Sequence, residues 1–170
     1  CSSADRYGKQ NTPLCTEDMI PLPQDPYGIA KYASELTVKN LCDIHGMEYV
    51  IVVPHNIIGS RQKYDDPYRN VASIMINRML QGKQPIIYGG GEQKRTFTFI
   101  DDVVTPPLMC AFSKKAVGEI INVGPEDEFV SINQLARTIA DLLGFELRPI
   151  YVTDRPAEVK FSTCSAKKAE

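Results

Sequence analysis

A tyrosine and a lysine four residues apart are the pair in this sequence whose types and spacing could do chemistry. Tyr27 and Lys31 follow Asp25 and Pro26, and a helix readily begins at such a pair, with Asp as N-cap and Pro at the first position. We therefore expect Tyr27 in a first helical turn and Lys31 on the same face, with their Cβ atoms about 5–6 Å apart. An ammonium at that distance favours the phenolate, which would make Tyr27 a general base. The pair also fits an ordinary amphipathic helix start with a solvated Lys31 and a half-buried Tyr27.

Further segments accompany this pair in a fixed order along the chain. Two serines precede a Tyr-Gly pair in CSSADRYG, residues 1–8. The others are PHNIIGSRQ (54–62), IYGGGEQKR (87–95), FIDDV (99–103), NVG (122–124) and RPAE (155–158). In this order the chain resembles the extended short-chain dehydrogenase/reductase family, the nucleotide-sugar epimerases and dehydratases. That family carries Ser-Ser-x-x-x-Tyr-Gly followed by Tyr-x-x-x-Lys.

The resemblance implies an α/β fold. It predicts the C-terminal part of a Rossmann-like, doubly wound parallel sheet, together with a smaller α/β substrate-binding subdomain. Residues 1–60 would supply the catalytic Ser/Tyr-x-x-x-Lys part of the Rossmann-like domain. Residues 61–170 would form mainly the substrate-binding subdomain, with Rossmann elements interleaved. The family's first half, with its Gly-rich phosphate turn, has no counterpart in these residues, so we expect the C-terminal half of an epimerase-like enzyme.

The resemblance also assigns catalytic roles. Tyr27 would be the base, and Ser3 would bind the sugar oxygen and help to pass its proton to Tyr27. Lys31 would stabilise the phenolate and bind the nicotinamide ribose. Asp5 is a further catalytic candidate, because dehydratase relatives carry acidic residues in this loop whereas epimerases usually carry small ones. At the position of Arg6 the family usually carries an apolar residue, so this chain departs from the family pattern there.

The implied cofactor is NAD, with Tyr27, Lys31, Pro54 and His55 as its contacts in this chain. The buried run at residues 49–53 predicts a parallel strand, and ligands bind at the carboxyl ends of such strands. We expect tight NAD binding to need the Gly-rich half as well.

Substrate contacts are implied at six positions. Arginines suit a diphosphate because a guanidinium donates paired hydrogen bonds to phosphate oxygens. The expected residues are Asn56, Arg61, Tyr88, Arg95, Arg155 and Glu158.

The sequence pattern predicts helices at residues 26–45, 71–80, 103–115 and 132–143. Strands are expected at 49–53, 85–88, 96–100, 119–122 and 147–152. Asp101 is interpreted as a helix cap, and Asp101 and Asp102 together as a core-facing polar pair. The glycines at 89–91 predict a hairpin-like turn.

Composition excludes several classes of function. With 43% hydrophobic and 24% charged residues and a formal net charge of −2, the chain is globular and has no basic footprint for nucleic acid or a membrane surface. No apolar run approaches the roughly 18 residues that span a bilayer. Five scattered cysteines and two distant histidines give no metal-ligand spacing, so we expect reduced thiols, no metal and a cytoplasmic location.

Three functions remain open. We favour an NAD-dependent epimerase that acts on a nucleoside-diphosphate sugar through a transient keto-sugar. A nucleotide-sugar 4,6-dehydratase, or a related sugar-modifying enzyme with Asp5 as its acid, is the second. The third is an inactive nucleotide-sugar-binding fragment. The expected partners are the sugar nucleotide, the N-terminal Rossmann half and a second copy in a homodimer.

Overall fold

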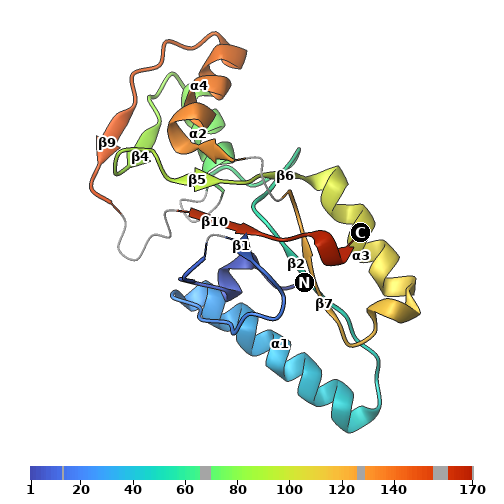
Figure 1. The fold of residues 1–170 in the computed structure, drawn as a ribbon. Helices are drawn as coiled ribbons and strands as arrows, with labels where there is room; N and C mark the ends of the chain where they lie inside the picture. Colours follow the sequence, from blue (N-terminus) through green and yellow to red (C-terminus); the bar gives the residue numbers. More distant parts are fainter. Residues whose placement is uncertain (13, 66–69, 126–128, 155–160, 170) are drawn as a thin grey trace.

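The computed structural model describes residues 1–12, 14–65, 70–125, 129–154 and 161–169 (Figure 1). Its α-helices are α1 (Pro26–His45), α2 (Val71–Leu80), α3 (Ile100–Phe112) and α4 (Ile132–Leu143). Short 3-10 helices are η1 (Ala4–Arg6), η2 (Lys114–Ala116) and η3 (Lys167–Ala169). Helices and strands interleave along the chain, which is the order of an α/β fold.

Among the residues that the structure describes, strand pairing is parallel except for one antiparallel pair. β2 (Ile51–Pro54) pairs with β7 (Ile120–Val123), β3 (Ile57–Ile58) with β6 (Thr98–Phe99), and β4 (Ile86–Tyr88) with β9 (Ile150–Val152). A further sheet has the order β1 (Leu14–Cys15), β10 (Phe161–Cys164), β5 (Lys94–Arg95) and β8 (Val130–Ser131), in which only β5 and β8 are antiparallel. The expected α/β fold with parallel strands is confirmed.

Local capping explains why α1 has the predicted bounds. The Asp25 carboxylate accepts a hydrogen bond from the Gly28 N–H at 2.6 Å, and Pro26 needs no partner at the first position. Gly46 ends the helix in the left-handed conformation, with φ at 64°. The helix buries Gly28, Glu35 and Cys42, while several of its apolar side chains stay exposed. These are Ile29, Leu36, Val38, Leu41 and Ile44.

Two expectations around residues 89–103 are wrong. α3 begins at Ile100 with Phe99 as N-cap and no side-chain cap, so Asp101 is not the cap. Asp101 and Asp102 lie exposed in the first helical turn and do not face a core. Carboxylates at this place interact favourably with the positive end of the helix dipole. The glycines after β4 do form a turn, but not a hairpin, because β4 pairs with β9 and not with β5.

Among the described residues, two separate clusters of buried apolar side chains form the core. One cluster lies between α2, α4 and β4 and contains Met75, Met79, Ile87, Ile132, Ala136, Ile139 and Ala140. The other contains Tyr7, Cys15, Ile51, Val53 and Cys164. The second cluster joins the first residues of the chain to β2 and to β10, so early and late segments share one core.

Within the described ranges, no helix is long and apolar enough to cross a membrane.

Candidate active site

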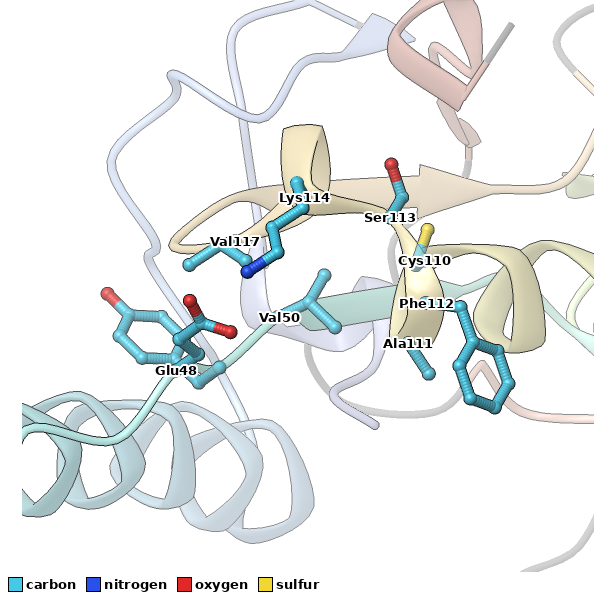
Figure 2. A pocket seen from close by; sticks show the side chains of 9 residues that line it. Glu48, Val50, Cys110, Ala111, Phe112, Ser113, Lys114 and Val117 are labelled. Atoms are coloured by element: carbon cyan, nitrogen blue, oxygen red, sulfur yellow. The ribbon is translucent and has the colours of Figure 1, made fainter.

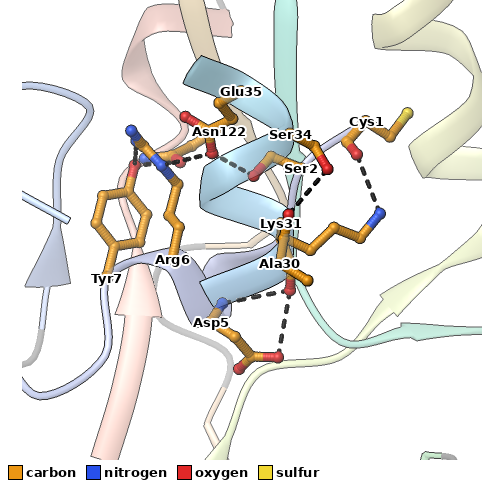
Figure 3. Close-up of polar contacts among 11 residues, drawn as sticks. Cys1, Ser2, Asp5, Arg6, Tyr7, Ala30, Lys31, Ser34, Glu35 and Asn122 are labelled. Carbon is orange, nitrogen blue, oxygen red and sulfur yellow. Dashed lines mark hydrogen bonds and ion pairs between the residues drawn. The ribbon is translucent and has the colours of Figure 1, made fainter. Parts of the chain in front are cut away.

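The segment from Cys1 to Tyr7 packs against the first turns of α1 and the edge of β2. The Ser2 N–H donates to the Val52 carbonyl at 2.8 Å, which extends the hydrogen bonding of β2 by one residue of the loop. On α1, the Lys31 ammonium donates to the Cys1 carbonyl at 3.1 Å (Figure 3). The loop is therefore held between a strand and a helix, which positions its side chains over the start of α1.

Tyr27 and Lys31 lie side by side on α1, as their spacing predicted. The Lys31 Nζ atom is 5.9 Å from the centroid of the Tyr27 ring. Tyr27 keeps 53% of its surface exposed, so a ligand can reach the residue. An exposed phenol beside an anchored ammonium can exchange a proton with a bound molecule.

Ser3 and Asp5 form a small polar turn near the start of the chain, where Ser3 caps η1. The Ser3 hydroxyl donates to the Asp5 carboxylate at 3.3 Å and accepts from the Asp5 N–H at 3.3 Å. Partial desolvation raises the pKa of the Asp5 carboxyl, and the nearby Asp25 carboxylate raises it further. The Ser3 hydrogen bond and the Arg95 guanidinium act in the opposite direction. Asp5 can therefore hold a proton more readily than an ordinary aspartate.

Pro54, the last residue of β2, and the next two residues, His55 and Asn56, lie at the carboxyl end of this strand, where α/β sheets bind ligands. Pro54 is paired with Val123 of β7 in the parallel register. The His55 N–H donates to the Val123 carbonyl at 3.1 Å. Burial lowers the pKa of His55 to about 4, so its imidazole is neutral at physiological pH. The Asn56 side chain donates to the Thr96 carbonyl at 2.9 Å, and its backbone has φ at 30°.

The other substrate candidates lie on different elements of the structure. Arg61 is exposed in a turn after β3, with a left-handed φ of 65°. Tyr88 ends β4 half-buried. Arg95 ends β5, donates to the Lys94 carbonyl at 2.8 Å and lies close enough to Asp5 to influence its pKa. Arg155 and Glu158 lie outside the described residues.

A model of the NAD dependent epimerase/dehydratase family matches residues 1–124 of the chain. The chain belongs to this family.

Several proteins similar to this family member are named as 4-epimerases of UDP-sugars. A putative UDP-glucose 4-epimerase of Methanocaldococcus jannaschii is 37% identical over 166 residues, which are 96% of this chain and 52% of that protein. UDP-glucose 4-epimerase of Thermotoga maritima, solved with UDP-glucose, superposes with a TM-score of 0.87 at 32% identity, over 99% of this chain and 54% of that one. UDP-glucuronic acid 4-epimerase of Bacillus cereus, solved with UDP-glucuronic acid and NAD, superposes with a TM-score of 0.88 at 28% identity. The match covers 99% of this chain and 52% of that one. The family member spans about half the length of these proteins.

The residues present in this family member fit one end of an NAD molecule. An ammonium and a phenol stand together on α1, and backbone groups of Pro54 and His55 lie at the carboxyl end of β2. A nicotinamide and its ribose offer hydroxyl and amide groups that suit these donors and acceptors. The sequence has no glycine-rich strand-to-helix turn for the pyrophosphate, so the fit covers the nicotinamide end alone.

A buried ion pair beneath the loop was not predicted from the sequence. Arg6 Nε lies 2.8 Å from Glu35 Oε1, with both side chains almost fully buried. A signal was available: Glu35 lies four residues after Lys31 and eight after Tyr27, on the same helix face. In the sequence, Arg6 stands out only because the family usually has an apolar residue at this position.

Two hollows in the described structure do not include Tyr27 or Lys31. One of about 380 Å³ lies before the amino end of β2, lined by Glu48, Tyr49, Val50, residues 110–114 and Val117 (Figure 2). The other, of about 370 Å³, includes Thr98, Val123 and Gly124 beside the carboxyl end of β7. The chemistry is therefore assigned from the polar groups around α1 and not from cavity size. Among the described residues, no group of three or more His, Cys, Asp or Glu could hold a metal ion.

Proposed function

We propose that this chain is the catalytic and substrate-binding half of an NAD-dependent epimerase that acts on a nucleoside-diphosphate sugar through a transient keto-sugar. The observation that carries the proposal is the pairing of Tyr27 with Lys31 at the start of α1, beneath the loop that holds Ser3. The proposal places the chain at the C-terminal side of the enzyme, with residues 1–60 in the Rossmann-like domain and residues 61–170 mainly in the substrate-binding subdomain. Relatives named as UDP-glucose 4-epimerases support the epimerase activity in this proposal.

In this proposal the chain's own residues move the proton. Tyr27, as the phenolate, takes the proton of a sugar hydroxyl, directly or through Ser3. Lys31 stabilises the phenolate and contacts the nicotinamide ribose. NAD, when bound, would supply the acceptor and donor of the hydride that leaves and rejoins the sugar carbon. Pro54 and His55 hold the nicotinamide end in place.

Arg95 is the described residue best suited to the diphosphate. It lies near Asp5, so a sugar bound between them would have its reacting end at the loop and its charged end at β5. Asn56, Arg61 and Tyr88 complete the proposed substrate contacts, and sequence alone adds Arg155 and Glu158. A guanidinium on a diphosphate makes charge-assisted hydrogen bonds, which are stronger than neutral ones.

The state of Asp5 favours one alternative. A carboxyl with a raised pKa, 3.3 Å from the Ser3 hydroxyl, is suited to donate a proton to a leaving hydroxyl group. A nucleotide-sugar 4,6-dehydratase with Asp5 as its acid is therefore the second candidate. The two functions share Tyr27 and Lys31 and differ in the product.

The proposal includes two protein partners. One is the N-terminal Rossmann half, which would supply the phosphate turn for NAD. The other is a second copy of the chain in a homodimer, for which the exposed apolar side chains of α1 give a surface.

The test uses the complete protein that contains this chain, supplied with NAD and UDP-glucose. We expect NMR spectra of the products to show a sugar inverted at one carbon. A deoxy-keto-sugar would show the dehydratase, and no change in any sugar nucleotide tried would favour a binding fragment. Tyr27→Phe should abolish turnover while NAD stays bound, because it removes the ionisable oxygen and little volume. Tyr151→Phe is the matched control, since Tyr151 is exposed on β9. More than about a tenth of the parent rate in Tyr27→Phe would refute Tyr27 as the base.

A further inference from the structure

Arg6 and Glu35 form an ion pair in a place where charges are costly to bury. Their side chains are only 2% and 3% exposed, and Arg6 Nε lies 2.8 Å from Glu35 Oε1 (Figure 3). Removing two charges from water costs several kcal/mol per ion, and an apolar pair of similar volume is often as stable or more so. Stability alone therefore does not account for this pair.

The pair joins the proposed catalytic loop to the proposed catalytic helix. Arg6 ends η1, immediately after Asp5. Glu35 lies on α1, one turn beyond Lys31 and on the same face. The Ser2 hydroxyl donates to the same oxygen, Glu35 Oε1. Ser2 and Arg6 lie immediately before Ser3 and after Asp5, so one carboxylate fixes the loop on both sides of its two polar residues.

Two aromatic rings lie close to the Arg6 guanidinium. It lies 5.0 Å from the centroid of the Tyr7 ring and 5.9 Å from that of the Tyr32 ring on α1. Arg6 Nη1 also donates to the Tyr7 hydroxyl at 3.4 Å, and that hydroxyl donates to Asn122 Oδ1 on β7 at 2.8 Å. The guanidinium thus links the loop, α1 and the sheet, and its position is set by all three.

We propose that Arg6 and Glu35 are positioning residues that set the place of Ser3 and Asp5 relative to Tyr27 and Lys31. The proposal rests on the proposed function of Tyr27. Both side chains are buried, so neither contacts the substrate, and their loss changes turnover much more than substrate affinity. A displacement of about 1 Å in such a constellation can cost on the order of 100-fold in rate.

The test replaces both charges in the complete protein. Arg6→Met/Glu35→Leu leaves no lone buried charge, so we expect its unfolding midpoint to stay near that of the parent. Its kcat should fall about 10- to 100-fold, with the Kd for the nucleoside-diphosphate sugar within about twofold of the parent. Amide hydrogen exchange of residues 3–8 should become faster while that of α1 is unchanged. The matched control is Glu146→Gln/Arg148→Met. It removes an exposed ion pair within the segment that connects α4 to β9, and it should change none of these values.

A second variant keeps the proposal testable if the double variant does not fold. Arg6→Lys retains the buried charge but loses the planar guanidinium, so we expect a stable protein with a lowered kcat and an unchanged Kd. Parent kcat in either folded variant, or unchanged exchange of residues 3–8, would overturn the proposal. Tyr27→Phe is assayed alongside: if that variant keeps its activity, the proposed function fails, whereas the exchange data still report whether the pair holds the loop.

Discussion

The α-carbon of Gly28 faces the backbone carbonyl of Asp5 so closely that a Cβ atom added there would lie 2.7 Å from the carbonyl oxygen. It would also lie 3.1 Å from Pro23 Cβ. Neither neighbour is the free end of a flexible side chain, so neither can give way easily. The absence of a side chain at Gly28 therefore lets the loop and the helix approach as they do.

Gly28→Ala should destabilise the protein, although Gly to Ala inside a helix usually stabilises by roughly 0.5–1 kcal/mol. Overpacking against the Asp5 carbonyl should instead cost roughly 1–3 kcal/mol, and kcat should fall as the loop moves. Urea unfolding and steady-state kinetics of the complete protein measure the two effects. Gly90→Ala is the control, because a Cβ there meets nothing within 4 Å. A Gly28→Ala protein that is more stable than the parent and fully active would contradict this account.

Elements with strong local signals could be predicted from the sequence. α1 was predicted with its correct ends because Asp25, Pro26 and Gly46 act within their own turns. α4 was predicted for the same reason, since Ser131 and Gln134 form a capping box and Gly144 ends the helix. Tyr27 and Lys31 could be placed together because helical spacing alone decides which residues share a face.

Features that depend on distant residues could not be predicted. β1 has only two residues and exists because β10 pairs with it, with Cys15 beside Cys164. The Arg6 and Glu35 ion pair likewise needs the loop to fold back on α1. The start of α3 was misplaced because Asp101 is a favourable cap by type, whereas strand pairing of β6 keeps the chain extended up to Phe99. Tertiary contacts decided each of these.

Arg95→Ala should weaken binding of a nucleoside-diphosphate sugar by about 1.5–3 kcal/mol, the usual scale of a hydrogen bond to a charged group. Calorimetric titration of the complete protein with UDP-glucose measures the change. Arg148→Ala serves as the control, because the Arg148 side chain is exposed and pairs with Glu146. Parent affinity in Arg95→Ala would remove this residue from the proposed diphosphate site.

His55 should make the fold sensitive to mild acid. Burial lowers its pKa from 6.5 to about 4, and in the described structure neither ring nitrogen has a hydrogen-bond partner. Between these values the unfolded chain binds more protons than the folded one. This contribution to stability is therefore complete above about pH 6.5 and is lost as the pH falls toward 4, by an amount on the order of 3 kcal/mol.

Replacing the imidazole should remove that sensitivity. His55→Phe should show a smaller loss of unfolding free energy between pH 7 and pH 4.5 than the parent, as measured by urea unfolding at each pH. His45→Phe is the matched control, because His45 is exposed at the end of α1. Equal pH dependence in the parent and in His55→Phe would show that this imidazole is not held neutral by the fold.

The 170-residue chain on its own should associate or fold only marginally, and it should bind NAD negligibly. The α1 side chains of Ile29, Leu36 and Ile44 are 54%, 49% and 66% exposed, and apolar surface of this kind tends to find a partner. Light scattering should therefore show a species larger than a monomer, and Leu36→Glu should reduce its size. Leu142→Glu is the control, since Leu142 is 82% exposed on α4. NAD needs a glycine turn at a helix N-terminus for its phosphates, and the sequence has none. A stable monomer that binds NAD at micromolar concentration would refute both expectations and require another place for the cofactor.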